Sequence, residues 1–99
     1  MSSIPNNEIL DKMATVLKIA ADSTRLKIIC AIDYEERSVG EIAELIEASQ
    51  SLVSHQLSIL RRAHLVRVRK EGKKAFYKLD DYHVNALVNI VRDHVLEEA

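Results

Sequence analysis

Residues 38–63 read SVGEIAELIEASQSLVSHQLSILRRA, and this stretch decides the fold. Ser38 is followed three residues later by Glu41, which is the pattern of a capping box and predicts a short helix over Val39–Glu47. A tight turn leads into a second helix, which we expect over Gln50–Ala63. Two short helices joined by a tight turn predict a helix-turn-helix.

The second of these helices has an apolar face and a polar face. Val53, Leu57 and Leu60 are spaced i, i+4, i+7, so they share the face that turns inward. The opposite face carries short polar and amide side chains that can form hydrogen bonds with base edges or phosphates. These candidate DNA-binding residues are Gln50, Ser51, Ser54 and His55, and Gln56 belongs to the same group. For any one of them, a merely exposed helix position is the alternative.

A basic β-hairpin is expected after the second helix. Val66–Arg69 alternates apolar and basic residues, as a half-buried strand does, and Ala75–Leu79 returns as the second strand. The turn is expected over Lys70–Lys73, and Phe76 falls on the nominally exposed side. Basic residues here would neutralise phosphates, which gives salt-dependent affinity with little sequence information. The candidate DNA-binding residues of the hairpin are Arg67, Arg69, Lys70, Lys73 and Lys74.

Three further helices complete the expected fold. The first is expected over Asn7–Ala20. The second is capped by Asp22 or Ser23 and ends near Asp33, and the last is capped by Asp80 or Asp81 and ends near Glu97. The helix ending near Asp33 is expected to pack through Leu26, Ile29, Cys30 and Ile32. The predicted fold class is mainly α with a β-hairpin, which is a winged helix-turn-helix.

Length and composition limit the kind of protein. The chain has 99 residues, 47% of them hydrophobic and 29% charged, which is ordinary for one small folded domain that self-association would help to stabilise. Its one cysteine excludes an internal disulfide and a multi-thiolate metal site within a chain. Charged residues interrupt the first apolar stretch, and no apolar run reaches the length of a membrane span. We therefore expect a cytoplasmic protein without a membrane partner.

The net charge of −1 conceals a strong asymmetry. Residues 61–78 contain eight basic residues and one acidic residue, so this segment carries +7. The remaining six basic and fourteen acidic residues give the rest of the chain −8. A solvated charged face is one explanation, but such a separation is typical of a surface that binds a polyanion such as double-stranded DNA.

Histidines and carboxylates recur on the expected last helix. Eleven residues at about 100° each bring His83 and His94 to within about 20° of one face, yet about 16 Å apart along the axis. One chain therefore cannot hold a single ion between them. In two copies packed antiparallel, Asp81 and His83 of one would meet His94 and Glu97 of the other, giving two identical sites per dimer. The apolar residues that suit this helix to pairing are Val84, Leu87, Val88, Val91 and Val95, with Ile90 beside the histidines.

Two imidazoles and two carboxylates suit tetrahedral Zn(II) and also accept Co(II), whereas Ni(II) prefers more ligands and a wider geometry. Such a set has no open position for a substrate, which favours sensing over catalysis and makes a small-molecule substrate unexpected. Two histidines on a helix surface are often without function, so a non-functional site is the alternative.

Residues 21–26 read ADSTRL, residues 49–57 read SQSLVSHQL and residues 79–83 read LDDYH. These stretches resemble the ArsR/SmtB family of metal-sensing winged-helix repressors, and the resemblance covers nearly the whole chain, about 7–97. It implies that the second stretch is the recognition helix and that the third opens a metal site on the last helix. His94 and Glu97 stand at the spacing of the family's zinc sensors.

The resemblance implies a homodimeric repressor, not an enzyme, that binds a two-fold operator without metal and is released by Zn(II) or Co(II). It also suggests a second hydrogen bond from His94 to the loop around His64, a residue that we expect to be half-buried. The expected division of the chain is a disordered 1–6, a helix-turn-helix over 39–63, a wing over 66–79, and a dimer and metal-binding helix over 80–97.

The chain also departs from part of this family. Members that sense soft metals through thiols carry cysteines at the start of the third helix, where residues 37–40 here read RSVG. Cys30 falls on the expected apolar face of the second helix and is predicted to be a buried core thiol. The alternative function is a DNA-binding repressor that is constitutive or redox-regulated through Cys30. A small zinc hydrolase would need an open ligand position and a pocket.

Overall fold

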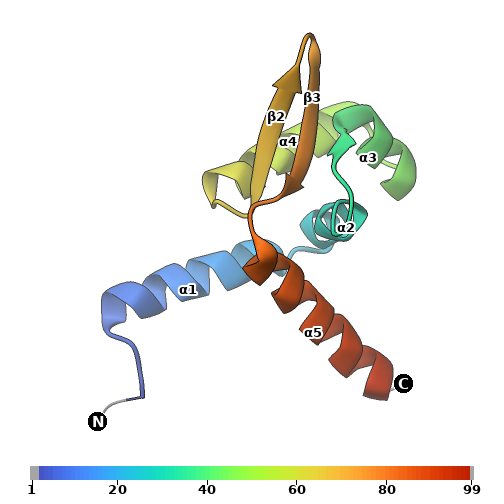
Figure 1. The fold of residues 1–99 in the computed structure, drawn as a ribbon. Helices are drawn as coiled ribbons and strands as arrows, with labels where there is room; N and C mark the ends of the chain where they lie inside the picture. Colours follow the sequence, from blue (N-terminus) through green and yellow to red (C-terminus); the bar gives the residue numbers. More distant parts are fainter. Residues whose placement is uncertain (1–2, 99) are drawn as a thin grey trace.

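The computed structural model describes residues 3–98, so Met1 and Ser2 of the predicted disordered segment lie outside the described residues, as does Ala99. Figure 1 shows the helices and strands: α1 (Asn7–Ala20), α2 (Ser23–Ala31), β1 (Arg37–Ser38), α3 (Val39–Ile46), α4 (Gln50–Arg62), β2 (Val66–Glu71), β3 (Lys74–Leu79) and α5 (Tyr82–Glu98). The predicted span of α1 is confirmed, and the predicted α3 and α4 differ by one residue at their C-terminal ends. No helix of the described residues is long and apolar enough to cross a membrane.

The core of the molecule lies where α2, α3 and α4 pack on one another and on the sheet. Val53, Leu57 and Leu60 are each fully buried, so the predicted inward stripe of α4 is confirmed. Their partners are aliphatic residues from the neighbouring elements. These are Ile28 and Ile29 of α2, Ile32 directly after it, Ile42 and Ala43 of α3, and Leu65, Val66 and Leu79 at the base of the hairpin.

Local hydrogen bonds set the start and end of the two helices that form the helix-turn-helix. The capping box predicted at α3 is present, because Ser38 Oγ accepts from the Glu41 N–H and the Glu41 carboxylate accepts from the Ser38 N–H. Glu47 ends α3 in the left-handed region, with φ of 56°. Ser49 then caps α4 by accepting from the Leu52 N–H at 3.1 Å. The turn is therefore fixed at both sides by residues of the quoted stretch.

The sheet has three strands in the order β1-β3-β2, one more than the predicted hairpin. The additional strand β1 has only two residues, which pair with Phe76 and Tyr77 of β3. The hairpin turn is shorter than predicted, because β2 and β3 extend to Glu71 and Lys74 and leave two residues between them. Gly72 has φ of 61° at the first of these two positions, as a type II′ turn requires.

The predicted cap of α2 at Asp22 and the predicted burial of Ile29 and Ile32 are confirmed, whereas the predicted end of the helix and the predicted packing of Leu26 and Cys30 are wrong. The helix ends at Ala31, and its buried face is formed by Ile28 and Ile29, with Ile32 just after its end. At 100° per residue these three isoleucines share one side of the helix, which turns Leu26 and Cys30 away from the core. Leu26 is 41% exposed, and Cys30 is exposed rather than a buried core thiol.

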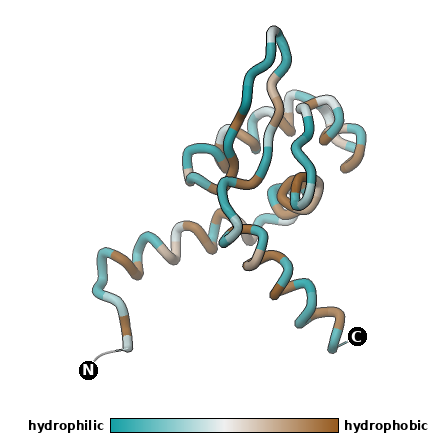
Figure 2. Tube along the Cα trace, in the orientation of Figure 1, coloured by the Kyte–Doolittle hydropathy of each residue, from teal (hydrophilic) through white to brown (hydrophobic). Residues whose placement is uncertain are grey.

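Helices α1 and α5 extend away from this core (Figure 1). None of the residues of α1 is buried, and α5 buries only Val84 and Val88. Figure 2 shows hydrophobic segments along both helices. Their exposed large apolar residues are Ile9, Met13 and Leu17 in α1 and Ile90, Val91, Val95 and Leu96 in α5. The apolar face predicted for α5 is therefore covered in its first half, by the burial of Val84 and Val88, and uncovered at Ile90, Val91 and Val95 within one chain.

Candidate nucleic-acid interface and metal-binding residues

The outer face of α4 presents polar side chains to solvent. The candidate residues Gln50, Ser51, Ser54 and His55 are all exposed. Near the helix start, the hydroxyl groups of Ser49 and Ser51 are 3.4 Å apart. Since α4 buries its opposite face, these side chains are available to a groove of DNA, and those of the first turn lie where a recognition helix contacts base edges.

Gln56 lies at the side of α4 and has a structural contact instead. Its Oε1 accepts a hydrogen bond from Arg25 Nη1 at 3.0 Å, and Arg25 Nε donates to the carbonyl of Ile19 at 2.8 Å. Both side chains are half-buried. Arg25 thus joins the last turn of α1 to the middle of α4, and Gln56 is not among the free polar groups of the outer face.

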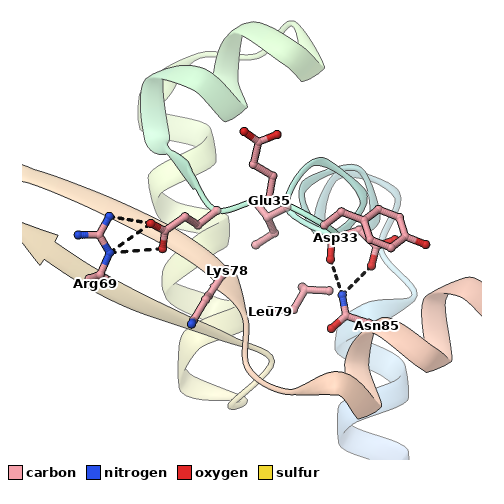
Figure 3. Close-up of a pocket in the computed structure, with 9 residues that line it drawn as sticks. Asp33, Glu35, Arg69, Lys78, Leu79 and Asn85 are labelled. Carbon is pink, nitrogen blue, oxygen red and sulfur yellow. Dashed lines mark hydrogen bonds and ion pairs between the residues drawn. The ribbon is translucent and has the colours of Figure 1, made fainter.

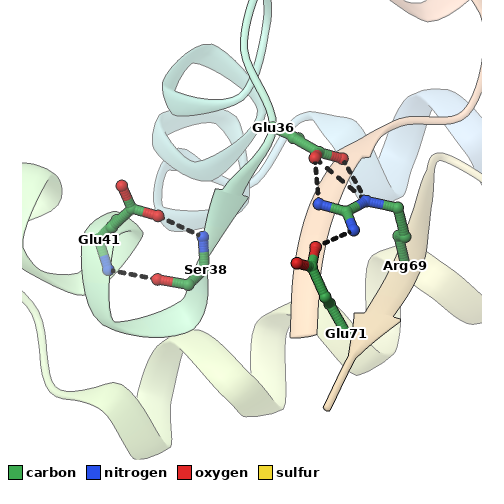
Figure 4. A network of polar contacts seen from close by, with 5 residues as sticks. All are labelled: Glu36, Ser38, Glu41, Arg69 and Glu71. Carbon is green, nitrogen blue, oxygen red and sulfur yellow. Dashed lines mark hydrogen bonds and ion pairs between the residues drawn. The ribbon is translucent and has the colours of Figure 1, made fainter. Parts of the chain in front are cut away.

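The two arginines of β2 are held by carboxylates of the same chain. Figure 4 shows Arg69 between Glu36 and Glu71, with its closest contacts at 2.6 Å and 2.5 Å. Its guanidinium also lies 4.9 Å from the centre of the Phe76 ring. These hydrogen bonds raise the pKa of Arg69, and the bond from Arg69 lowers the pKa of Glu36. Arg69 therefore ties β2 to the segment before β1.

Arg67 is paired in a similar way at the base of the hairpin. Its Nε is 3.5 Å from the Asp80 carboxylate, and its Nη2 donates to the Asp80 carbonyl. By contrast, Lys70, Lys73 and Lys74 are exposed and form no hydrogen bond or ion pair within residues 3–98. Of the five hairpin residues predicted to bind DNA, the three at its tip therefore keep a free positive charge.

An open groove of about 630 Å³ joins the hairpin tip to the helix-turn-helix. It is lined by the start of α3, by Gln50 at the start of α4, and by Lys73 and Lys74. The fold thus brings cationic side chains of the hairpin beside the first residue of α4. The sequence predicted these residues separately, and the structure places them on one surface.

The metal-ligand candidates at the start of α5 lie close together. Asp81 caps the helix, because its Oδ1 accepts from the backbone N–H groups of His83 at 2.9 Å and Val84 at 3.2 Å. Its Oδ2 is 3.5 Å from His83 Nδ1. Partial desolvation opposes ionisation of this carboxyl, but the hydrogen bonds from Val84 and His83 outweigh it and lower the pKa of Asp81.

The candidates at the far end of α5 do not meet the first pair. His94 Nε2 is 3.3 Å from Glu98 Oε1, a partner that the sequence did not single out. Glu97 is exposed and forms no hydrogen bond or ion pair with residues 3–98. Within residues 3–98 of one chain, no group of three or more histidine, cysteine, aspartate or glutamate residues could hold a metal ion.

His64 differs from its prediction. It is exposed rather than half-buried, and its φ of 60° puts it in the left-handed region just after α4. Within the described chain, His94 bonds to Glu98, and none of its hydrogen bonds reaches the loop around His64.

The comparisons with known proteins agree with this arrangement. Residues 22–68 match the family described as bacterial regulatory protein, arsR family. The transcriptional repressor SmtB homolog of Synechocystis is 40% identical over 86 residues, which are 87% of this chain and 65% of that protein. The cadmium resistance transcriptional regulatory protein CadC homolog of Staphylococcus aureus is 40% identical over 88 residues, or 88% and 73% of the two chains.

Solved structures of similar proteins share the fold. HlyU from Vibrio cholerae, named a transcriptional activator, matches with a TM-score of 0.83 and 36% identity over 89% of this chain and 96% of that chain. The homodimeric winged helix-turn-helix DNA-binding domain of Mb0332 from Mycobacterium bovis matches with a TM-score of 0.82 and 31% identity, covering 100% and 96%. The chain has the winged helix-turn-helix fold and belongs to the ArsR family of bacterial transcriptional regulators, which are not enzymes.

Proposed function

We propose that the chain is a cytoplasmic transcriptional repressor whose homodimer binds operator DNA in the metal-free state and releases it when Zn(II), or Co(II), binds between two α5 helices. The observation that carries this proposal is the placement of two histidine–carboxylate pairs at the two ends of an α5 whose apolar face one chain leaves uncovered.

The DNA-binding half of the proposal rests on one surface. The exposed polar residues at the start of α4 would enter a major groove, and the lysines of the hairpin tip would contact the adjoining phosphates. Arg67 and Arg69 were expected to contact DNA, but their guanidinium groups already pair with Asp80 and with Glu36 and Glu71. We therefore assign phosphate contacts to Lys70, Lys73 and Lys74, and give the arginines the role of shaping the wing.

The dimer in this proposal is formed by α1 and α5. Their exposed apolar residues would be unusual on the surface of a monomer of this size, because apolar patches of this kind mark contact surfaces. A two-fold axis would place the same residues of both chains in one interface. Homodimers occur among the similar solved structures, as in the domain from Mycobacterium bovis.

The residues present fit a bound Zn(II) ion. In a tetrahedral site with bonds of about 2.0–2.1 Å, neighbouring ligand atoms lie about 3.3 Å apart. The 3.5 Å between Asp81 Oδ2 and His83 Nδ1 is close to this separation, and Asp81 uses its other oxygen for the helix cap. His94 and Glu97 of the second chain would complete four ligands. When bound, the ion would connect the two chains through their nitrogen and oxygen ligands.

Glu98 adds a role that the spacing did not indicate. Its carboxylate lies 3.3 Å from His94 Nε2, so it would orient the imidazole ring and leave Nδ1 for the metal. We assign Glu97 as the ligand and Glu98 as the orienting residue.

The test is the affinity of the purified dimer for a duplex that it selects from a random library, measured by fluorescence anisotropy with and without Zn(II). We expect high affinity without metal and release on addition of Zn(II). The control is the His94→Ala variant, which should bind the duplex and keep it in Zn(II). Equal affinity of the wild type in both conditions would contradict the metal-responsive part of the proposal.

A redox-regulated repressor is the second candidate, and the exposure of Cys30 favours it. Arg92 lies near the Cys30 thiol, which raises the pKa of Arg92 together with Asp33 and Tyr34. The affinity for the same duplex, measured with hydrogen peroxide in place of Zn(II), separates the two candidates. The Cys30→Ser variant is the control for oxidation of the thiol.

A further inference from the structure

A buried carboxylate joins α5 to the end of α2. Asp33 is the only buried charged residue among residues 3–98, and its side chain is 2% exposed. An ionised carboxylate in such a place needs partners, because its loss of solvation is otherwise unfavourable. The partners of Asp33 therefore show what this residue holds in place.

Both partners come from α5. Asn85 Nδ2 donates to Asp33 Oδ1 at 2.8 Å and also to the Asp33 carbonyl, as Figure 3 shows. Arg92 Nη2 donates to Asp33 Oδ2 at 3.3 Å. Asn85 and Arg92 are seven residues apart, so two helical turns separate them on one face of α5. One aspartate thus contacts the helix at two points along its length.

Further hydrogen bonds fix these partners. Asn89 Oδ1 accepts from Arg92 Nη1 at 2.6 Å and from the Tyr34 hydroxyl at 3.0 Å, and Asn89 Nδ2 donates to the Asn85 carbonyl at 2.8 Å. Asn89 therefore connects Arg92 to Tyr34, the residue after Asp33. We call these five residues the Asp33 network.

The Asp33 network is important because little else attaches α5 to the core. Only Val84 and Val88 of α5 are buried, and both belong to the first half of the helix. Apolar contacts of this size allow small rotations, whereas hydrogen bonds to a buried carboxylate require a defined direction. The network thus fixes both the tilt and the rotation of α5.

The network also lies opposite the candidate metal ligands. Arg92 and His83 are nine residues apart in α5, which puts them about 180° apart around the helix. At the other side of the network, Asp33 follows α2, which packs on α3 and α4. A change in the position of α5 would therefore reach α2 and the recognition helix through Asp33.

We propose that the Asp33 network is the positioning element that fixes α5 relative to the DNA-binding core and transmits the position of α5 to α4. The transmission to DNA rests on the proposed function, whereas the positioning of α5 does not. None of the residues of the network is a metal ligand or a DNA contact in that proposal.

The first test needs neither metal nor DNA. Residual dipolar couplings of backbone N–H groups report the orientation of α5 relative to α2–α4 in the intact dimer. We expect one alignment frame to fit both parts of the wild type and of the control variant Asp93→Asn, an exposed carboxylate of α5. In Asp33→Asn and Arg92→Gln, α5 should require a frame of its own. A single frame for both variants would overturn the proposal, and Arg92→Gln alone decides if Asp33→Asn does not fold.

The second test separates this inference from the proposed function. Zn(II) should change duplex affinity in the wild type, and this change should fall by about tenfold in Arg92→Gln while Zn(II) affinity stays within about threefold. An unchanged response in Arg92→Gln would contradict the transmission. If the wild type itself does not respond to Zn(II), the proposed function fails, and the dipolar couplings still decide whether the network positions α5.

Discussion

The core of α2–α4 and the sheet differs from the outer helices α1 and α5 in how its apolar residues are used. In the core, helix α4 buries its whole inward stripe of Val53, Leu57 and Leu60 within one chain. In α1 and α5, most large apolar residues stay exposed and only two valines are buried. The first region buries its apolar residues within one chain, whereas the second exposes apolar residues that a partner chain could cover.

This difference assigns different tasks to the two regions. The core buries its inward apolar residues within one chain, so it needs nothing from a second molecule to form the DNA-binding surface. The outer helices depend on a partner, so their position can change when a ligand binds between two chains.

A charge on the exposed face of α5 should separate the two chains. In Ile90→Glu, each chain would place one carboxylate in the interface. We expect burial of these charges to cost about 4 kcal/mol or more of dimer stability, which weakens dimer affinity about 10³-fold. Sedimentation velocity measures this change. The control is Leu45→Glu, the same kind of change at an exposed leucine of α3, which should stay dimeric. A dimeric Ile90→Glu would show that α5 is not in the interface.

Truncation in the core should reduce stability without affecting a partner. Leu57→Ala removes a fully buried side chain from α4, and we expect the free energy of unfolding to fall by about 3 kcal/mol in a urea titration. Leu45→Ala makes the same change at an exposed position and should stay within about 0.5 kcal/mol. Similar losses for the two variants would contradict the assignment of a closed core.

The two glutamates at the end of α5 should differ in their effect on metal binding. Glu97→Gln would remove a ligand and should weaken Zn(II) binding by about 100-fold or more, whereas Glu98→Gln would remove an orienting bond and should cost about tenfold. Competition with a chelating dye measures both affinities, and Glu44→Gln serves as the control. The reverse order would make Glu98 the ligand.

The wing should divide into residues that bind phosphate and residues that do not. Lys73→Ala and Lys74→Ala should each reduce the slope of log affinity against log salt concentration by about 1.8, the value for two lost phosphate contacts, one from each chain of the dimer. Arg69→Gln should leave this slope unchanged, because its guanidinium already pairs with Glu36 and Glu71. If Arg69→Gln reduced the slope as much as a lysine variant does, Arg69 would have to be assigned a phosphate contact.

The features that the sequence could predict are those with local causes. The capping box of Ser38 and Glu41 depends on residues three apart, and the buried stripe of α4 follows from helical periodicity. Asp81 at the start of α5 is another such signal, because an aspartate before a helix caps its first N–H groups. Each of these follows from a segment of fewer than a dozen residues.

The features that the sequence missed depend on contacts between distant residues. Strand β1 has two residues and exists only because β3 pairs with it. The charge of Arg69 suggested a DNA contact, but Glu36, 33 residues away in the chain, binds it. Cys30 falls on the expected apolar face of α2 and is predicted to be buried, yet the isoleucines turn it outward. No local pattern carries this information.

The central claim is that two chains share each metal site, and a mixed dimer tests it most directly. His83→Ala and His94→Ala each damage both sites of their own homodimer, so neither should show the visible bands of tetrahedral Co(II). A dimer with one chain of each variant keeps one site, formed by Asp81 and His83 of one chain and His94 and Glu97 of the other. We predict that this mixed dimer binds one Co(II) with those bands. A mixed dimer without them, or either single variant with them, would contradict the shared site.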